Sequence, residues 1–232
     1  MFRYLITKGG NISSYLISLL LTLPIILLSL SVHEASHAWM ANKLGDPTAR
    51  NLGRLTLNPF KHLDLVGFIC MLLFGFGWAN PVPVNSRYFK KPRRDMALTA
   101  AAGPLSNIVL GFIFVSLYEI SYLLTVRLFP SVAASAPMVI YVWLTFLQMG
   151  AELNVYLAVF NLIPVPPLDG SRLFYIFLPV KWYFGIMKYE KYISIALFAL
   201  LWLGVLSVPL TWISNHVLDG IYGLWSLIPI FR

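Results

Sequence analysis

Four long apolar runs, separated by polar stretches, set the pattern of the chain. They cover about residues 15–40, 97–126, 138–163 and 193–212. Each run contains the roughly 20 predominantly apolar residues that a helix needs to cross the hydrocarbon core of a membrane. The pattern therefore predicts an all-α integral membrane protein, a polytopic helical bundle of about four to six spans.

A shorter apolar stretch, residues 65–78, does not fit this pattern. It is marginal in length for a crossing helix, and Gly67, Gly75 and Gly77 interrupt it before the sequence N-P-V-P. A full crossing would also place the basic residues before and after it on opposite faces of the membrane. We therefore expect a re-entrant or β-hairpin-like segment near residues 65–85, with more extended strand and turn than helix.

The composition indicates one membrane-embedded domain. Hydrophobic residues make up 59% of the 232 residues and charged residues only 11%, so the apolar excess has to face lipid. No polar stretch is long enough to form a soluble domain. We expect a single domain over residues 1–232, with its core at about 15–180 and an additional C-terminal span at about 193–212. The single cysteine, Cys70, excludes an internal disulfide and a cysteine-based zinc site.

The basic residues are distributed unevenly around the apolar runs. Thirteen of the 17 Lys and Arg residues lie in the stretches 41–96 and 164–192. By the positive-inside rule, these two stretches face the cytoplasm, and with four spans both termini then lie outside. The net charge of +8 is better explained by anionic lipid headgroups than by a nucleic-acid partner, because the basic residues lie beside membrane segments.

The first apolar run contains His33, Glu34 and His37 near its end, in the sequence H-E-A-S-H. Residues four apart share a helix face, so both imidazoles can bind one metal ion, with Glu34 beside the coordination position left for water. An alternative is a pair of interfacial histidines bonded to the backbone, but three ionisable groups are expensive at membrane depth. Lys43 lies about 9 Å beyond His37 along a helix. We therefore expect the site near the cytoplasmic face.

A catalytic zinc usually takes three protein ligands, so a third ligand has to come from elsewhere in the chain. Asp169 follows P-V-P-P at the end of the third run and opens an apolar segment, where free backbone N–H groups can hold its carboxylate. A plain helix N-cap is the alternative role for this residue. The other candidates are the remaining histidines and the carboxylates inside the apolar runs: His62, His216, Glu119 and Glu152.

Three sequence blocks resemble the site-2 proteases, peptidase family M50, which are intramembrane zinc metalloproteases. The blocks are S-V-H-E-A-S-H at 31–37, A-A-G-P-L-S-N at 101–107 and N-L-I-P-V-P-P-L-D-G at 161–170. The stretch G-F-G-W-A-N-P-V-P-V-N at 75–85 is similar to the short prokaryotic branch of the family. Unlike many relatives, the chain has no room for a PDZ or CBS regulatory domain.

The resemblance implies one Zn²⁺ ion per chain. By residue-to-residue match with the family motifs, its three ligands are His33, His37 and Asp169. It also implies that Glu34 is the general base. Two asparagines, Asn107 and Asn161, would lie near the site as candidates to orient the substrate or stabilise the oxyanion. The stretch 75–85 would form a strand beside the cleft, with these substrate-binding candidates: Gly75, Gly77, Trp78 and Asn80.

The expected function is that of an intramembrane zinc metalloprotease in the cell membrane, which hydrolyses peptide bonds in or near transmembrane segments. Its partners are transmembrane protein substrates and the lipid bilayer, and a homo-oligomer is left open. A proteolytically silent homologue is disfavoured, because the ligand set and the general base are intact. A proton- or metal-coupled transporter is the alternative, although the chain has no repeat and few spans. Such a transporter would use a relay of ionisable residues: His33, Glu34, Glu119, Glu152 and Asp169.

Overall fold

The computed structural model describes residues 12–74 and 77–231 of the chain, and helices account for most of them. In chain order the helices are α2 (Ile12–Lys43), α3 (Thr48–Asn51), α4 (Leu65–Phe74), α5 (Pro92–Tyr122), α6 (Pro130–Ser135), α7 (Pro137–Asn161), α8 (Asp169–Phe174), α9 (Val180–Lys188), α10 (Glu190–Trp202) and α11 (Ser207–Ser226). A π-helical turn, Leu123–Leu128, extends α5. Short 3₁₀ turns occur at Pro59–Lys61, Ser86–Tyr88, Tyr175–Phe177 and Pro229–Phe231.

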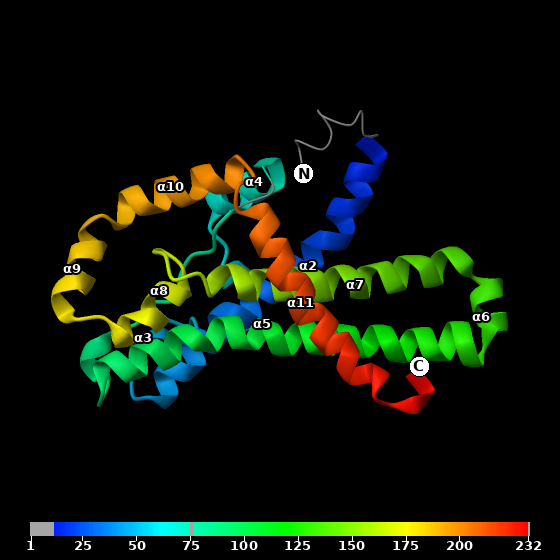
Figure 1. The fold of residues 1–232 in the computed structure, drawn as a ribbon, viewed down its shortest axis with the longest axis horizontal. Helices are drawn as coiled ribbons and strands as arrows, with labels where there is room; N and C mark the ends of the chain where they lie inside the picture. The colour runs from blue at the N-terminus through cyan, green and yellow to red at the C-terminus, as the bar shows by residue number, and fades with distance from the viewer. Residues whose placement is uncertain (1–11, 75–76, 232) are drawn as a thin grey trace.

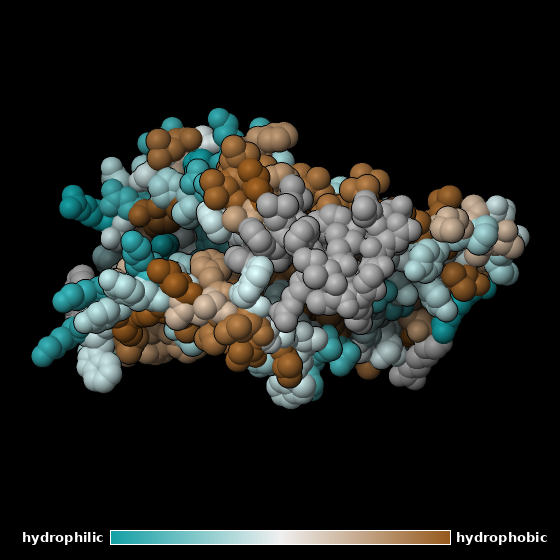
Figure 2. All heavy atoms as spheres, turned by 90° about the horizontal axis from the view of Figure 1, so that it is seen from above, coloured by the Kyte–Doolittle hydropathy of each residue, from teal (hydrophilic) through white to brown (hydrophobic). Residues whose placement is uncertain are grey.

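Three of these helices are long and apolar enough to cross a membrane. They are Leu16–Lys43 within α2, Pro92–Leu128 formed by α5 with its π-helical turn, and α7; α10 and α11 add a fourth if they count as one broken span. No β-strand occurs within residues 12–74 and 77–231. Figure 2 shows hydrophilic atoms gathered most densely at the end of the molecule where α3 and α9 lie. The prediction of an all-α, multi-pass membrane protein is thus confirmed.

Helix α2 carries several hydroxyl groups that a membrane helix has to satisfy internally. Ser29, Ser31 and Ser36 each donate to the backbone carbonyl four residues earlier, at 2.7, 2.6 and 2.7 Å. These bonds let polar side chains occupy an apolar helix without a partner from another element. Helix α2 runs from Ile12 through the histidine motif to Lys43.

Helix α5 lies at the centre of the bundle and packs against α2, α7, α8 and α11. Figure 1 shows α5 and α7 side by side along the long axis, with α11 crossing them. Where α5 and α7 meet, a Cβ on Gly150 would lie 2.4 Å from Cδ1 of Phe114, so only glycine allows this approach. The buried core at the junction of the three helices is formed by Phe114, Val115, Leu147, Ala151, Val155, Val159, Leu210, Leu218 and Ile221.

The last apolar run differs from the single span expected over residues 193–212. It forms two helices, α10 and α11, that meet at an angle of 81°. Gly204 lies in the break with a φ of +76°, a left-handed conformation that glycine adopts without steric cost. Pro209 follows in the first turn of α11, where its missing N–H costs no hydrogen bond.

Of the re-entrant or β-hairpin-like segment expected near residues 65–85, residues 65–74 form the helix α4, so the expectation of extended structure is wrong for this part. Gly67 does not break this helix but gives room for the chain that returns over it, because a Cβ there would lie 2.1 Å from the backbone oxygen of Trp78. The following residues, 77–85, are largely extended, and Leu63 and Ala79 form an isolated antiparallel β-bridge. Ten residues of helix span only about 15 Å, half of the hydrocarbon core.

Candidate metal centre

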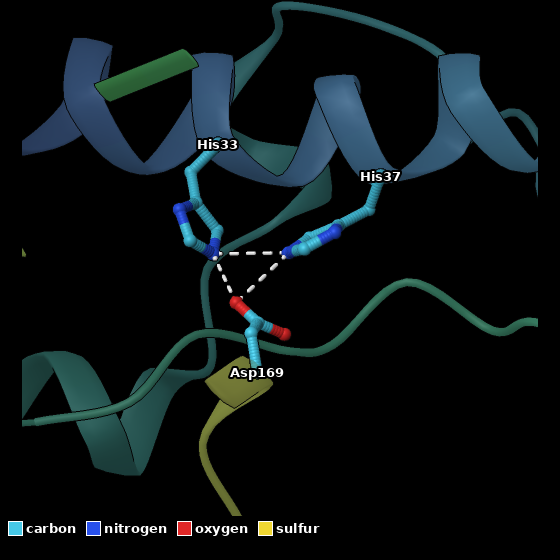
Figure 3. A group of neighbouring side chains, drawn as sticks. All are labelled: His33, His37 and Asp169. Atoms are coloured by element: carbon cyan, nitrogen blue, oxygen red, sulfur yellow. Dashed lines mark hydrogen bonds and ion pairs between the residues drawn. The ribbon is translucent and has the colours of Figure 1, made fainter. Parts of the chain in front are cut away.

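His33 and His37 project from one face of α2 toward Asp169, the first residue of α8 (Figure 3). The two Nε2 atoms lie 3.0 Å apart. Oδ2 of Asp169 lies 3.0 Å from Nε2 of His33 and 3.2 Å from Nε2 of His37. Three potential ligand atoms thus lie next to one another. More than 130 residues of chain separate the histidine motif from Asp169.

These separations match those of a metal site. The ligand atoms of a tetrahedral zinc site lie about 3.3 Å apart when the metal–ligand bonds are about 2.0 Å long. Two imidazole nitrogens and one carboxylate oxygen are also ligand types that zinc accepts. The donor set therefore fits zinc in both chemistry and spacing, and leaves the fourth tetrahedral position for water or substrate.

The far nitrogen of His37 determines which of its two ring nitrogens can bind a metal. Nδ1 of His37 lies 2.7 Å from the backbone oxygen of Thr99 in α5. A carbonyl oxygen only accepts hydrogen bonds, so Nδ1 must carry the proton. Nε2 is then unprotonated and presents its lone pair to the point where the three ligand atoms meet.

His33 is held in the same tautomer by a chain of side-chain amides. Its Nδ1 lies 2.6 Å from Oδ1 of Asn107, whose Nδ2 donates to Oδ1 of Asn154 at 2.9 Å. Nδ2 of Asn154 donates in turn to the backbone oxygen of Gly150 at 2.8 Å. Because that carbonyl only accepts, the orientation of both amides is determined and His33 Nδ1 must donate. Both asparagines are fully buried.

Gly103 allows α5 to approach the two imidazoles. A Cβ at this position would lie 2.3 Å from Nε2 of His37 and 2.7 Å from Cε1 of His33. Any side chain here would displace the ring atoms that face Asp169. Gly103 lies four residues before Asn107, so both are on the same face of α5. This face leaves space for the two imidazoles at Gly103 and hydrogen-bonds His33 through Asn107.

Asp169 does not cap its own helix. Leu168 is the N-cap of α8, and no side chain makes a capping hydrogen bond there. Gly170 lets the start of α8 lie against the end of α7, because a Cβ there would be 2.3 Å from the backbone oxygen of Leu162.

Glu34 is held by a backbone group from a distant part of the chain. Its Oε2 accepts a hydrogen bond of 2.9 Å from the backbone N–H of Val82. The side chain is buried and lies on the wall of the same cavity as the histidines. Oε1 is the second oxygen of this carboxylate and takes no part in that hydrogen bond.

Hydrogen bonds to other parts of the chain hold segment 77–85 at several points along its length. The backbone N–H of Asn80 donates to the backbone oxygen of His62 at 2.7 Å, and that of Asn85 donates to Oδ2 of the fully buried Asp46 at 2.7 Å. The guanidinium of Arg54 donates to the backbone oxygen of Asn80. These hydrogen bonds therefore fix the position of the Val82 backbone N–H that donates to Glu34.

The ligand atoms and Glu34 open into a large cavity of about 1330 Å³. Pockets for small molecules usually measure roughly 300–1,000 Å³, so this cavity has room for a segment of polypeptide. Its walls come from α2, α4, segment 77–85, α5, α7, α8 and α10. The wall is largely apolar, and its imidazole, carboxylate and guanidinium side chains are those of His33, Glu34, His37, Asp169, Arg172 and Glu190.

The remaining candidates from the sequence lie in different surroundings. Gly77, Trp78 and Asn161 border the cavity, whereas Gly75 lies outside the residues that the structure describes. Asn80 follows Trp78 in the anchored segment. The other ionisable candidates do not border the cavity: His62, His216, Glu119 and Glu152.

Several contacts at the site have no counterpart among the sequence candidates. Thr99 and Val82 act through backbone atoms, which no residue type identifies. Asn154 lies in an apolar run and has no motif around it. Gly103 belongs to the quoted A-A-G-P-L-S-N block, so its spacing from Asn107 was a usable signal.

Comparison with known proteins agrees with the geometry. The model of peptidase family M50 matches residues 21–205. The chain is 38% identical over 204 residues to the protein named "Putative zinc metalloprotease YwhC" of Bacillus subtilis, covering 88% of this chain and 90% of that protein. It is 31% identical over 149 residues to "Putative zinc metalloprotease Rip2" of Mycolicibacterium smegmatis, covering 62% and 52% of the two chains. No solved structure matches significantly. The chain therefore belongs to peptidase family M50, the site-2 protease family.

Proposed function

We propose that this protein is an intramembrane zinc metalloprotease that hydrolyses peptide bonds in or near the transmembrane segments of other proteins. The observation that carries the proposal is the meeting of His33 Nε2, His37 Nε2 and Asp169 Oδ2 within 3.2 Å, on the wall of a cavity that also contains Glu34. Membership of a metallopeptidase family supports peptide bonds as the target and zinc as the metal.

In this proposal each side chain has a distinct task. His33, His37 and Asp169 hold the ion, and Asn107 and the Thr99 carbonyl keep the two imidazoles in the binding tautomer. A zinc ion with three protein ligands lowers the pKa of a bound water and polarises a carbonyl. Glu34, held at Oε2 by Val82, would accept at Oε1 a proton from the water that adds to the peptide carbonyl, and would later pass this proton to the leaving amine as the C–N bond breaks.

The substrate class follows from where the site lies. The two histidines are part of α2, a helix long and apolar enough to cross the membrane. A peptide bond inside a helix is hydrogen-bonded and covered, so a substrate helix has to unwind locally before it enters the cavity. Gly77 and Trp78 on the cavity wall would pair with the unwound segment, and Asn161 would contact it. The backbone N–H and carbonyl of Asn80 are already bonded to His62 and Arg54, so Asn80 would support this segment rather than pair with the substrate.

The arrangement in the membrane remains part of the proposal. The basic stretches 41–96 and 164–192 support a site near the cytoplasmic face of the cell membrane, with both termini outside if the chain crosses four times. A single domain is supported by α5, which packs against helices from both ends of the chain. One chain supplies all three ligands, so a monomer is sufficient for one zinc ion.

Transport through an intramembrane relay is less well supported. Glu34 and Asp169 lie on the cavity wall, but Glu119 and Glu152 do not. Glu152 accepts a hydrogen bond from Gln148 on its own helix and is exposed. The five ionisable residues of the proposed relay therefore do not line a common path.

Removing a ligand should remove the metal. Purified wild-type protein should hold about one zinc per chain. His37→Ala and Asp169→Ala should hold far less, because two ligands bind zinc weakly; elemental analysis measures the ratio. His216→Ala is the control, since His216 is an exposed residue of α11 that bonds to the Trp212 carbonyl. Full zinc occupancy in both ligand variants would contradict the assignment.

Gly103→Ala should disturb the site without touching a ligand. The added methyl group would overlap the ring atoms of His37 and His33, so zinc content and proteolysis should both fall. Gly220→Ala is the matched control, because a Cβ at Gly220 meets nothing within 4 Å. Retention of full zinc and activity by Gly103→Ala would show that the rings do not need this space.

Asn107→Ala should weaken zinc binding about 10- to 100-fold, the usual effect of removing a partner of a metal-bound histidine. Zinc competition with a chelator measures the affinity. Asn107→Asp keeps an acceptor for His33 Nδ1 and should lose less. Asn161→Ala should leave the affinity unchanged, because Asn161 donates to its own helix at the Leu157 carbonyl. Equal affinities for wild type and Asn107→Ala would refute the positioning role.

Glu34→Gln should keep the zinc but lower proteolysis by about 10²–10⁴, the contribution of a general acid–base group. Cells producing Glu34→Gln should accumulate uncleaved membrane proteins that are shortened in cells producing the wild type, as read by mass spectrometry of membranes. Glu119→Gln is the control, because this intramembrane carboxylate does not border the cavity. Identical membrane proteomes for wild type and Glu34→Gln would argue against proteolysis.

A further inference from the structure

One face of α7 is polar, although this helix is apolar enough to cross a membrane. Its residues follow one another at spacings of three or four, which places them in a single stripe along the helix. We call this stripe the α7 polar face, and it consists of Tyr141, Thr145, Gln148, Glu152 and Tyr156.

Most of the α7 polar face is exposed. Tyr141 is 67% exposed and Tyr156 37%, and both Gln148 and Glu152 are exposed. The core side of α7 is occupied instead by the buried Leu147, Gly150, Ala151, Asn154, Val155 and Ala158. The stripe is therefore available to a partner within the membrane.

The centre of the stripe lies at membrane depth. The 25 residues of α7 give a length of about 38 Å, and Glu152 lies about 22 Å from the start of the helix and about 13 Å from its end. Gln148 and Glu152 have short side chains that cannot extend to the interface as Lys and Arg do. An ionisable group exposed at such a depth is costly unless it has a partner, and it therefore indicates a functional site.

The pair Gln148–Glu152 can accept such a partner. Nε2 of Gln148 donates to Oε1 of Glu152 at 2.9 Å. This bond uses one donor position of the amide and one acceptor position of the carboxylate. The carboxylate has further acceptor positions, and the amide oxygen is an acceptor too. The pair thus favours a partner that donates hydrogen bonds.

The stripe is continuous with the catalytic cavity. Tyr156 borders the cavity together with Leu153 and Leu157 of the same helix. From Tyr156 the stripe runs along α7 toward the α6 end of the molecule, the end opposite α8 and α9 (Figure 1). Glu152 lies about one turn and Gln148 about two turns beyond Tyr156.

We propose that the α7 polar face binds the part of a substrate transmembrane helix that stays helical outside the cavity, and that it selects substrates with a hydrogen-bond donor in that part. The donor is Ser, Thr, Asn, Gln, His or a basic residue, about four to eight residues from the unwound segment. This inference rests on the proposed proteolytic function, since the cavity has to receive the unwound segment.

A second copy of the chain fits the stripe less well. Pairing of two α7 helices around a membrane-normal twofold axis would bring like residues together, so that the two Glu152 carboxylates face each other and repel. A substrate helix with a donor meets no such repulsion. The connection to the cavity through Tyr156 also has no purpose in a dimer contact.

The test uses two designed single-span probes that differ at one residue. Each is a tagged helix of Leu and Ala with a Gly-Pro break, and six residues from the break one probe carries Asn and the other Leu. Binding to the Glu34→Gln protein in phosphatidylcholine vesicles is measured by fluorescence energy transfer. The Asn probe should bind about 3- to 10-fold more tightly, as expected for one or two hydrogen bonds between membrane helices.

Substitutions on the stripe should remove this preference. With Glu152→Leu added, both probes should bind equally, while zinc content stays unchanged. Glu152→Gln should retain part of the preference, because its amide still accepts a hydrogen bond. Val142→Leu, an exposed apolar position of α7 outside the stripe, is the matched control and should keep the full preference.

Binding by the Glu34→Gln protein is read without proteolysis, so the two hypotheses can fail separately. If the wild type cleaves neither probe nor any membrane protein but the Asn preference persists, the proposed function fails and the docking surface stands. An equal affinity for both probes before any change at Glu152 would overturn the docking surface. Self-association of the protein in probe-free vesicles that is lost with Glu152→Leu would also overturn it, in favour of a second copy.

Discussion

The direction of one chain of hydrogen bonds determines what the site can bind. The Gly150 carbonyl can only accept, so Asn154 presents its amide nitrogen there and its oxygen to Asn107. Asn107 then presents its own oxygen to His33, whose Nδ1 has to donate. Nε2 is left unprotonated beside Asp169. Because a protonated nitrogen binds no metal, the chemistry of the cavity depends on an acceptor two helices away from the imidazole.

The same chain of hydrogen bonds crosses three helices and therefore depends on their close packing. Lipid provides no hydrophobic force between membrane helices, so small residues and buried hydrogen bonds hold them together. Gly103 leaves room for the imidazoles, and a Cβ at Gly111 would lie 3.0 Å from the side chain of Val155. The contacts that hold α2, α5 and α7 together are thus the contacts that orient His33. A substitution that loosened this packing would lower stability and would also release His33 from the metal-binding tautomer.

Features set by residues close together in the sequence could be predicted, whereas features set by the packing of distant segments could not. His33 and His37 are related by one helical turn, so their spacing alone predicts a shared face. Asp169 is recognisable as a helix start, but only the packing of α8 against α5 brings it to the histidines. Thr99 escapes prediction because it acts through a carbonyl that every residue type carries. The break at Gly204 also escapes a hydropathy pattern, because the run remains apolar across it.

The position of Glu34 links the proposed chemistry to the substrate. Its carboxylate is held by Val82, and Val82 is held because Asn85 is bonded to the buried Asp46 and Asn80 to the backbone of His62. The segment that orients Glu34, the proposed general base, is therefore the one that borders the cavity where an unwound substrate would lie. A substrate strand that paired with this segment would act on the backbone that holds Glu34. Substrate binding and the orientation of the base are then mechanically coupled through one piece of extended chain.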